Sequence, residues 1–399
     1  MYLYKSVIAL YILGWLLSGC LSLVAPPPAI PQMPVNGRFP DPDERVMINQ
    51  TYLNDPIIVN GLAYVESVVP ANLLSIPLSR YILFGNVTYT ADPAATCYWQ
   101  QDQCVRATTG PWGQPDIVTC PNDYDWGLAY DDAPTSNLVG TSHVNDTTTL
   151  LAVLDQMNIK ASFFVTGSQA SYEGPTLQQI AKDNQHIAHH TWTHHPMTSL
   201  TNAQIVAEML YTQAMIYNVT GLAPVYFRPP YGDIDDRVRA IVNALGFRVA
   251  IWVKGYDSRD SDVVPSAASY QPVLRTVQGW FNTKPGFISL QHTISTFTNG
   301  VAEDALKAII AMGGIKNQMQ AIPQCLGDTA WYRNKNVTTK FNTCTIPSGC
   351  GTTNSSTNAT STIPVMATEA VVNAKSCAAT PQLSSTAVAL IGLLSYVLL

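Results

Sequence analysis

The sequence predicts an α/β fold with a parallel sheet that closes, or nearly closes, into a barrel. From about Asp123 onwards, short apolar segments alternate with longer segments of helical periodicity. Each return to a parallel strand requires a crossover, which is usually a helix. A strand–helix unit that repeats this often therefore favours a parallel sheet, most simply one that closes on itself.

The predicted elements follow one another in a regular order. Residues 126–130 (WGLAY) form a buried strand, and residues 147–159 form a helix with Leu150, Leu151, Leu154 and Met157 at helical spacing. The later predicted elements are strand 160–167, helices 175–185 and 202–221, strand and turn 225–232, helix 233–247, strand 248–253, strand 287–292 and helix 301–313. Gly221 is the expected C-terminal end of helix 202–221.

Composition indicates one sizeable globular core with extensions at both ends. The chain has 399 residues, of which 47% are apolar and 12% charged. Its formal net charge of -6 provides no basic surface for a phosphate backbone, so nucleic acid is not an expected partner.

Both ends of the chain have the pattern of processing signals. Residues 1–25 combine a lysine, an apolar run and a break at small residues and prolines, as in a secretory signal peptide. Residues 379–399 combine small residues, a polar spacer and an apolar tail, which is the order of a glycosylphosphatidylinositol (GPI) attachment propeptide. A permanent transmembrane anchor is the weaker alternative, since the apolar tail 387–399 is short for a membrane helix and lacks a charged flank.

Residues 17–20 (LSGC) raise a second alternative, because they resemble a bacterial lipoprotein site with lipid on Cys20. N-glycosylation sequons favour a eukaryotic secretory route and N-glycans instead; they begin at Asn49, Asn86, Asn145, Asn218, Asn336, Asn354 and Asn358. We therefore expect a protein of the cell surface, GPI-anchored in the plasma membrane and cell wall.

The cysteines agree with an oxidising compartment. Cys20 lies in the signal peptide and Cys377 beside the expected GPI attachment site. The remaining cysteines are an even set suited to three disulfides: Cys97, Cys104, Cys120, Cys325, Cys344 and Cys350. Cys344 and Cys350 are close enough in sequence to pair with each other.

The rest of the chain divides by composition. Residues 26–120 are rich in proline and short apolar runs, so we expect an N-terminal extension packed on the core formed by residues 121–315. Residues 316–351 form a disulfide-linked segment, and residues 352–378 have the composition of a glycosylated Ser/Thr-rich stalk.

Polar clusters follow several of the predicted strands, where parallel barrels carry their functional groups. Asp131 and Asp132 come directly after residues 126–130, although two adjacent carboxylates on a turn closed by Pro134 could also be merely solvated. His190 and His194 stand four residues apart, so in a helical turn they face the same side. Two imidazoles and Asp132 would suit a hydrolytic divalent metal such as zinc.

These clusters resemble the motifs of the polysaccharide deacetylases of carbohydrate esterase family 4, and most closely of the fungal chitin deacetylases. The first motif matches "AYDDAP", the second "HTWTH", the third "RPPY" and the fifth "ISLQH", in the expected order over residues 129–292. The stretch from "CYWQQDQC" to "DYDWGLAYDD" is also similar to the fungal enzymes.

The resemblance implies a distorted (β/α) barrel and a role for each matching residue. Asp131 would be the general base and His292 the general acid, while Asp132, His190 and His194 would hold a zinc or cobalt ion. Arg228 would fix Asp131, Asp257 would orient His292, the backbone N–H of Tyr231 would bind the oxyanion, and Leu290 would line the pocket for the acetyl methyl group.

The sequence also departs from the family pattern. Ala129 and Ala133 replace the usual Thr and Gly, and an alanine would be strained where the family glycine needs a positive φ. In the fourth motif, Asp257 and Asp260 keep their spacing, but Ser261 stands where an aromatic residue is usual. Thr293 follows His292 in place of a frequent acidic residue.

Three functions are compatible with these features. The favoured one is metal-dependent removal of N-acetyl groups from the N-acetylglucosamine residues of chitin, giving chitosan and acetate at the fungal cell surface. The second is an O-acetyl esterase acting on another polysaccharide, since the tetrahedral chemistry is shared. The third is a wall-bound carbohydrate-binding glycoprotein with an impaired site.

Overall fold

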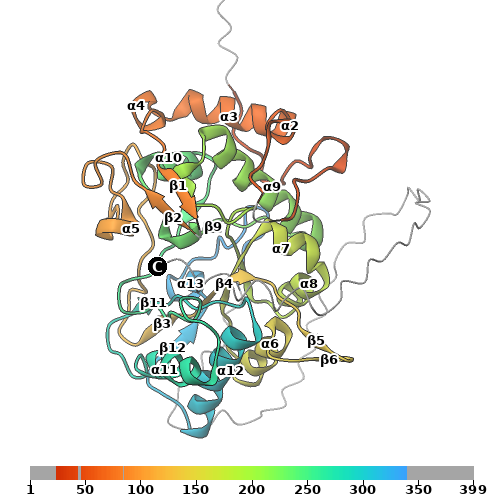
Figure 1. Cartoon of the computed structure of the whole chain (residues 1–399), viewed down its shortest axis with the longest axis vertical. Coiled ribbons are helices and arrows are strands. Elements are labelled where there is room, and N and C mark those ends of the chain that lie inside the picture. Colours follow the sequence, from red (N-terminus) through yellow and green to blue (C-terminus); the bar gives the residue numbers. More distant parts are fainter. Residues whose placement is uncertain (1–23, 44–45, 84, 339–399) are drawn as a thin grey trace, which may run out of the picture. The chain divides into compact units, whose positions relative to one another are not determined.

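The structure, a computed structural model, describes residues 24–43, 46–83 and 85–338 (Figure 1). Several predicted features lie outside these residues: the signal peptide up to residue 23, Cys20, Cys344, Cys350, Cys377, the sequons at Asn354 and Asn358, the stalk and the GPI propeptide.

Two parallel sheets form the centre of the described fold. One has the strand order β10–β9–β8–β7–β4 and the other β11–β3–β12. The strands are β3 (Asp125–Gly127), β4 (Ala129–Ala133), β7 (Ser162–Val165), β8 (His186–His189), β9 (Tyr226–Phe227), β10 (Arg248–Val249), β11 (Phe287–Ile288) and β12 (Gln318–Gln320). Most of their residues are buried, as expected for strands with helices around them.

Parallel bridges join these strands into an irregular closed ring. The chain beyond β11 pairs with β4 through His292 and Asp131, and with the chain beyond β10 through Leu290 and Asp257. Leu128 connects the two sheets, because its N–H donates to Gln320 (2.9 Å) and its carbonyl accepts from Ser162 (2.9 Å). The predicted α/β barrel is confirmed, and its distortion lies in the short strands and these single bridges.

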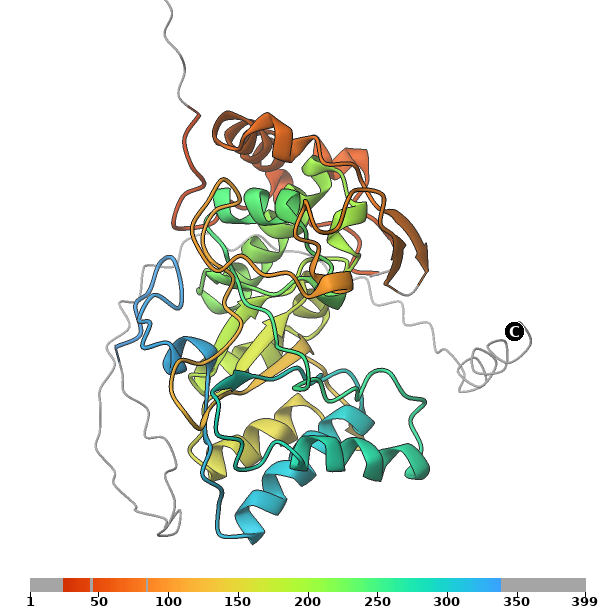
Figure 2. The ribbon, with the colours of Figure 1, turned by 90° about the vertical axis from the view of Figure 1, so that its left-hand side faces the viewer.

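Helices surround the ring, as Figure 2 shows. They are α6 (Thr147–Gln156), α7 (Gly167–Tyr172), α8 (Gly174–Lys182), α9 (Asn202–Thr220), α10 (Asp236–Ala244), α11 (Ala267–Gln278), α12 (Thr296–Ala311) and α13 (Ile322–Cys325). Helices α6, α11 and α12 pack together on one side of the strands, and α9 and α10 pack together on the other (Figure 2). Gly221 ends α9 in the left-handed conformation (φ 72°), as its position predicts.

Some elements were not expected from the sequence. Helix α11 contains Pro272 in its interior, and α7 is short and polar, so neither has a strong helical pattern. Strand β8 was not predicted, because its two histidines made it part of a histidine-rich stretch without an apolar strand pattern.

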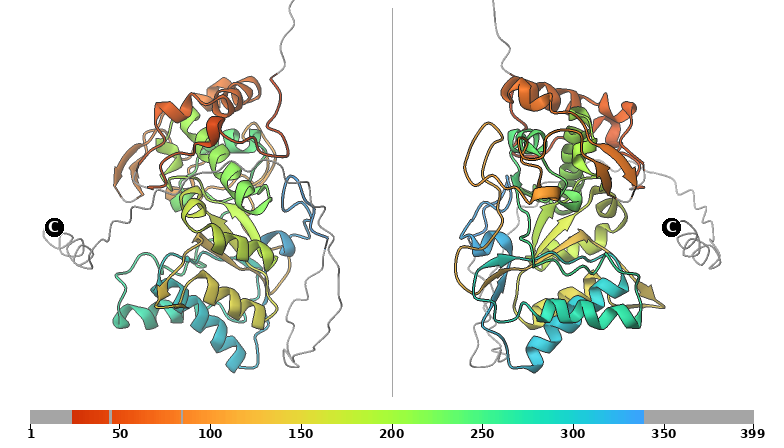
Figure 3. Two further views of the ribbon diagram at one scale, coloured as in Figure 1. Left: turned by 90° about the vertical axis from the view of Figure 1, so that its right-hand side faces the viewer. Right: turned by 60° about the vertical axis from the view of Figure 1, so that its left-hand side comes forward.

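The N-terminal extension forms small elements that pack on α9 and α10. They are η1 (Val35–Gly37), α2 (Gln50–Leu53), α3 (Pro56–Val68), α4 (Ala71–Leu74), the antiparallel hairpin of β1 (Arg80–Leu83) and β2 (Asn86–Thr88), and α5 (Trp99–Asp102). Helix α3 lies against α9 (Figure 3). Its residues Ile58 and Val65 are fully buried. The other short elements are β5 (Leu138–Val139), β6 (Ser142–His143), η2 (Met197–Ser199) and η3 (Pro230–Gly232).

Two of the three predicted disulfides fall within the described residues. Cys97 pairs with Cys104, seven residues away, across α5. Cys120 pairs with Cys325 over a separation of 205 residues and so ties the chain before β3 to α13. None of the described helices has both the length and the apolar character needed to cross a membrane.

Candidate active site

Three predicted metal ligands converge at the carboxyl ends of β4 and β8. Asp132 Oδ1 lies 3.1 Å from Nε2 of His194 and 3.5 Å from Nε2 of His190. One nitrogen or oxygen atom from each residue lies within 4.8 Å of the corresponding atoms of the other two. The site is thus a compact group of one carboxylate and two imidazoles.

The protonation of these groups favours a cation between them. Nδ1 of His190 lies 2.8 Å from the carbonyl of Arg228 and therefore carries the proton, which leaves a lone pair on Nε2. Burial and the neighbouring His194 lower the pKa of His190, which keeps its ring neutral. Asp132 Oδ1 is buried without a hydrogen-bond partner among the described residues. A divalent metal ion would satisfy these facing lone pairs, so the residues present fit the implied cofactor.

The two histidines do not converge through a helical turn, and the sequence-based reason for their pairing was wrong. They belong to an irregular loop after β8 in which Thr191 (φ 66°) and His194 (φ 55°) adopt left-handed conformations. The carboxylate of Glu208 on α9 holds this loop, since it accepts from the N–H groups of Trp192 (2.7 Å) and Thr193 (2.8 Å). The convergence of the ligands thus depends on a buried acid from another element.

The expected strain at Ala133 is absent. The residue with a positive φ in this turn is Asp132 (φ 62°), whereas Ala133 is not among the described residues with positive φ. Asp132 tolerates this conformation better than most side chains, because aspartate and asparagine are enriched in the left-handed region.

Asp131 is paired with Arg228 next to the metal-ligand group, with Asp131 Oδ2 3.8 Å from Nε2 of His190. Nη1 of Arg228 donates to Asp131 Oδ1 at 2.7 Å, and both side chains are almost fully buried. The guanidinium lies 4.2 Å from the centre of the Phe164 ring. Burial raises the pKa of Asp131 to about 6, although Arg228 opposes the shift. The carboxylate that would act as a base is thus held in one orientation with a pKa suited to neutral pH.

His292 is oriented by Asp260, which corrects the prediction of Asp257 for this role. Nδ1 of His292 lies 2.6 Å from Asp260 Oδ1, and its backbone N–H donates to Asp260 Oδ2 at 3.0 Å. Asp257 instead accepts from the N–H of Arg259 (2.9 Å), which has a φ of 55°. The turn at Arg259 directs the later aspartate of the motif towards the ring and leaves the earlier one to stabilise the turn.

The surroundings of His292 favour its protonated form. Burial alone would lower the pKa of the imidazole, but Asp260, together with the charges of Asp132 and Asp131, raises it to about 10. A protonated imidazole facing the site is a proton donor.

Tyr231 and Leu290 lie next to these groups. Tyr231 has a φ of 59°, and its hydroxyl lies 3.1 Å from Nδ1 of His194, a contact that the sequence did not predict. Leu290 is 6% exposed and lies two residues before His292. The roles predicted for the Tyr231 N–H and the Leu290 side chain remain predictions.

The comparisons with known proteins agree with this geometry. Residues 119–250 match the family model of polysaccharide deacetylases. Over these residues the chain is similar to polysaccharide deacetylases. This confirms the resemblance inferred from the sequence motifs.

Curated relatives of this chain include fungal chitin deacetylases. Chitin deacetylase 1 of Cryptococcus neoformans var. grubii is 34% identical over 244 residues, which are 58% of this chain and 48% of that protein. The chitin deacetylase of Amylomyces rouxii is 35% identical over 234 residues, 57% of this chain and 53% of that protein. This chain thus spans about half the length of the relatives it matches.

Solved structures give a weaker similarity. The chitin deacetylase of Colletotrichum lindemuthianum has a TM-score of 0.45 and 22% identity, covering 56% of this chain and 98% of that one. A peptidoglycan deacetylase from Bacillus subtilis has a TM-score of 0.43 and 25% identity, covering 52% and 92% of the two chains.

Sequence reasoning missed three contributors to this candidate site. Asp260 was visible in the fourth motif but was not chosen as the partner of His292. Glu208 is an acid among apolar residues of α9, a pattern that indicates a buried charge with partners. The role of the Tyr231 hydroxyl had no sequence signal, because it depends on how two loops meet.

Proposed function

We propose that this protein is a metal-dependent chitin deacetylase, which hydrolyses the N-acetyl groups of N-acetylglucosamine residues to give chitosan and acetate. The observation that carries the proposal is the presence, in one site, of the Asp132, His190 and His194 group beside the Asp131–Arg228 pair and the His292–Asp260 pair. The match to the polysaccharide deacetylase model and the names of the fungal relatives support the reaction and the substrate.

Asp132, His190 and His194 would hold the metal ion. When bound, a divalent cation such as zinc or cobalt supplies a Lewis acid that polarises the acetyl carbonyl and makes water a stronger nucleophile. Asp131 removes a proton from the attacking water, and Arg228 keeps the accepting carboxylate in place.

The remaining groups act on the amide. The N–H of Tyr231 donates to the carbonyl oxygen as negative charge develops on it. His292 then gives a proton to the amide nitrogen, the C–N bond breaks, and the amine and acetate are released. Asp260 stabilises the protonated ring before this step.

A polar cavity lined by residues close in sequence to Asp132 and His292 supports a carbohydrate substrate. It has a volume of about 420 Å³, and its lining includes Thr135, Asn137, Gln169 and Thr296. Thr135 and Thr296 follow closely on the segments that carry Asp132 and His292. Amide and hydroxyl side chains of this kind can pair with sugar hydroxyls.

We also propose that the protein is secreted and held at the cell surface by a GPI anchor. The two disulfides and the exposed sequon asparagines Asn49, Asn86, Asn218 and Asn336 support passage through the secretory pathway. Release from intact cells by a phosphatidylinositol-specific phospholipase tests the anchor. Recovery only of a detergent-soluble form that still ends at Leu399 would oppose it.

Acetate release tests the activity. The protein is incubated with chitin oligomers and, separately, with acetylated xylan, each with and without a chelator. Acetate from chitin oligomers that the chelator abolishes is the expected result. Release from xylan alone would favour the O-acetyl esterase, and binding without acetate release would favour a carbohydrate-binding glycoprotein.

A further inference from the structure

The N-terminal extension reaches the candidate metal site through the β1–β2 hairpin. This hairpin lies upstream of residues 119–250, the part of the chain that matches the family model. At its base, the N–H of Ser79 donates to the carbonyl of Thr198 (3.0 Å), and the two hydroxyls lie 2.7 Å apart. The ring of Tyr81 makes an edge contact with His195 at 5.4 Å between ring centres. The hairpin is therefore fixed to the segment that directly follows His194.

The turn of the hairpin lies against the ring of Tyr231. Gly85 is buried in this turn with a φ of +76°, and a Cβ atom placed on it would lie only 2.4 Å from Cε1 of Tyr231. Real Cβ contacts are never this short, so the ring occupies the space that any larger residue would need. Gly85 meets two demands at once, a left-handed backbone and close approach to an aromatic ring.

Tyr231 connects the hairpin to a metal ligand. When Nε2 of His194 binds the metal ion, its Nδ1 carries the proton and can donate to the Tyr231 hydroxyl, which lies 3.1 Å away. The left-handed backbone of Tyr231 (φ 59°) is uncommon for a bulky residue and persists only where its surroundings enforce it.

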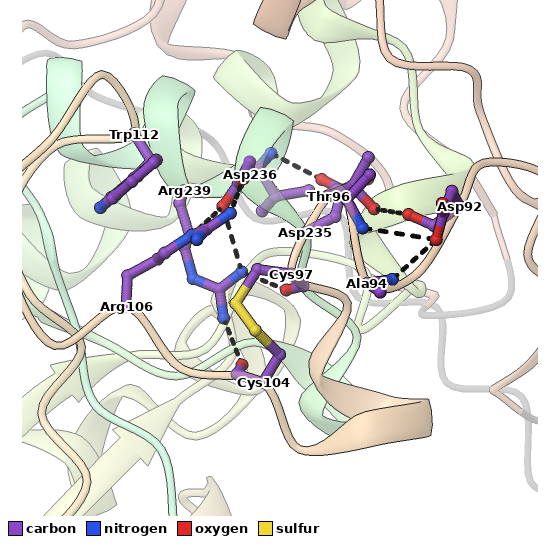
Figure 4. A network of polar contacts seen from close by, with 12 residues as sticks. Asp92, Ala94, Thr96, Cys97, Cys104, Arg106, Trp112, Asp235, Asp236 and Arg239 are labelled. Carbon is purple, nitrogen blue, oxygen red and sulfur yellow. Dashed lines mark hydrogen bonds and ion pairs between the residues drawn. A yellow bond between two sulfur atoms is a disulfide. The ribbon is translucent and has the colours of Figure 1, made fainter.

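A second upstream segment, the disulfide loop of Cys97 and Cys104, supports Tyr231 from its C-terminal side. Trp99 packs on Gly232 so closely that a Cβ there would lie 2.2 Å from its ring, and the Trp99 N–H donates to Ile234 (3.0 Å). Figure 4 shows what anchors this loop: Arg239 donates to the carbonyls of Cys97 (2.6 Å) and Cys104 (3.0 Å).

We propose that the β1–β2 hairpin is a positioning element of the metal site, in which Gly85 holds the ring of Tyr231 so that its hydroxyl fixes the orientation of His194. The proposal rests on metal binding by Asp132, His190 and His194 and is independent of the substrate. It gives a function to a segment outside the matched family domain. Gly85 and Tyr231 act through His194 and are not themselves ligands.

Binding of Co²⁺ to the metal-free protein tests the proposal without any substrate. Affinity is measured by calorimetry, and the geometry of the site is followed by the visible absorption spectrum of bound Co²⁺. Tyr231→Phe removes only the hydroxyl and should weaken binding about 10-fold or more, as loss of a hydrogen-bond partner of a metal-bound histidine usually does. Gly85→Ala should weaken binding similarly and change the spectrum, since the ring must move.

The double variant identifies the route of the effect. If Gly85 acts through the Tyr231 hydroxyl, adding Gly85→Ala to Tyr231→Phe should change affinity less than about twofold, which is the usual error of additivity. Equal losses in both backgrounds would overturn the proposal, because they would indicate a general structural effect.

Gly140→Ala is the matched control. Gly140 also lies in a hairpin turn with a left-handed backbone (φ +64°), but a Cβ there would meet nothing within 4 Å. Both alanines should lower the melting temperature of the metal-free protein through backbone strain. Only Gly85→Ala should lower Co²⁺ affinity, and an equal loss in Gly140→Ala would refute the proposal.

Two further outcomes are decisive. If Gly85→Ala yields no folded protein, Ser79→Ala replaces it, because it removes only the buried hydroxyl contact at the hairpin base. Unchanged Co²⁺ affinity in folded Gly85→Ala, or in Ser79→Ala where it replaces Gly85→Ala, would overturn the proposal. A wild-type protein that binds no Co²⁺ would overturn both this proposal and the proposed function, whereas binding of Co²⁺ without acetate release would reject the function alone.

Discussion

The carboxylate of Asp260 lies 2.6 Å from Nδ1 of His292 and is 2% exposed. Two charged groups this close in a buried setting stabilise each other strongly, and removing one alone leaves the other without compensation. The protonated state of His292 therefore depends on Asp260, and so does its capacity to donate a proton.

Replacing Asp260 should change the pH dependence of turnover. Asp260, together with the charges of Asp132 and Asp131, raises the pKa of His292 to about 10 against the effect of burial, so Asp260→Asn should lower that pKa. A general acid is active only when protonated, so activity falls as the pH rises through its pKa. The alkaline limb of the kcat/KM profile should therefore move to lower pH in Asp260→Asn.

Asp257→Asn is the control for this prediction. It makes the same chemical change in the same motif, but Asp257 accepts its hydrogen bond from Arg259. The alkaline limb should move less than in Asp260→Asn. Equal shifts in the two variants would show that the direct contact with His292 has no special effect.

The neighbouring aspartates Asp131 and Asp132 should respond differently to substitution. Asp131→Asn should lower kcat by about 10² to 10⁴-fold, the usual contribution of a general base, while metal content stays close to that of the wild type. Asp132→Asn should lose metal affinity as well as turnover, and excess metal should restore part of its activity because His190 and His194 remain. Acetate release and metal content, measured on the same samples, check both expectations. Near-normal turnover in both variants would mean that neither carboxylate has the proposed catalytic or metal-binding role.

Glu208 should stabilise the metal-ligand loop. Its carboxylate accepts from the N–H groups of Trp192 and Thr193 and from the Thr193 hydroxyl (2.7 Å), and it is 1% exposed. Glu208→Ala leaves buried donors unpaired, which should lower the free energy of unfolding by about 1 to 3 kcal/mol or more. Urea unfolding of the metal-free protein measures this loss. Glu66→Ala, at an exposed position of α3, should have little effect, and a similarly small effect of Glu208→Ala would contradict the proposed role.

Removal of the metal should reduce stability in a ligand-dependent way. A ligand that binds only the folded state stabilises it by about 2.7 kcal/mol when present at about 100 times its dissociation constant. Calorimetric melting with Co²⁺ and with a chelator should therefore give a lower midpoint for the chelated wild type. Asp132→Asn should show a much smaller difference between the two conditions. The prediction fails if the chelator leaves the wild-type midpoint unchanged.

The sequence by itself determined the α/β class, the position of most strands and helices, and the residues that gather at the site. These features are local, since apolar periodicity and glycine at a helix end depend on the nearest neighbours along the chain. Asp132 could be chosen because it follows a predicted strand, whereas His190 and His194 were indicated by their four-residue spacing and by the motif resemblance.

The tertiary structure alone decided how these residues are held. The left-handed backbone conformations of Asp132, Thr191 and His194 set the directions of the metal ligands. No sequence pattern predicted these conformations. Whether Asp260 or Asp257 pairs with His292 depended on the path of a single loop.

Longer-range contacts were equally hidden from the sequence. Glu208 meets the histidine loop, and Gly85 meets Tyr231, from segments distant along the chain. The physical reason is that a buried hydrogen bond or a close backbone approach forms between surfaces that exist only after the barrel and its extension have packed.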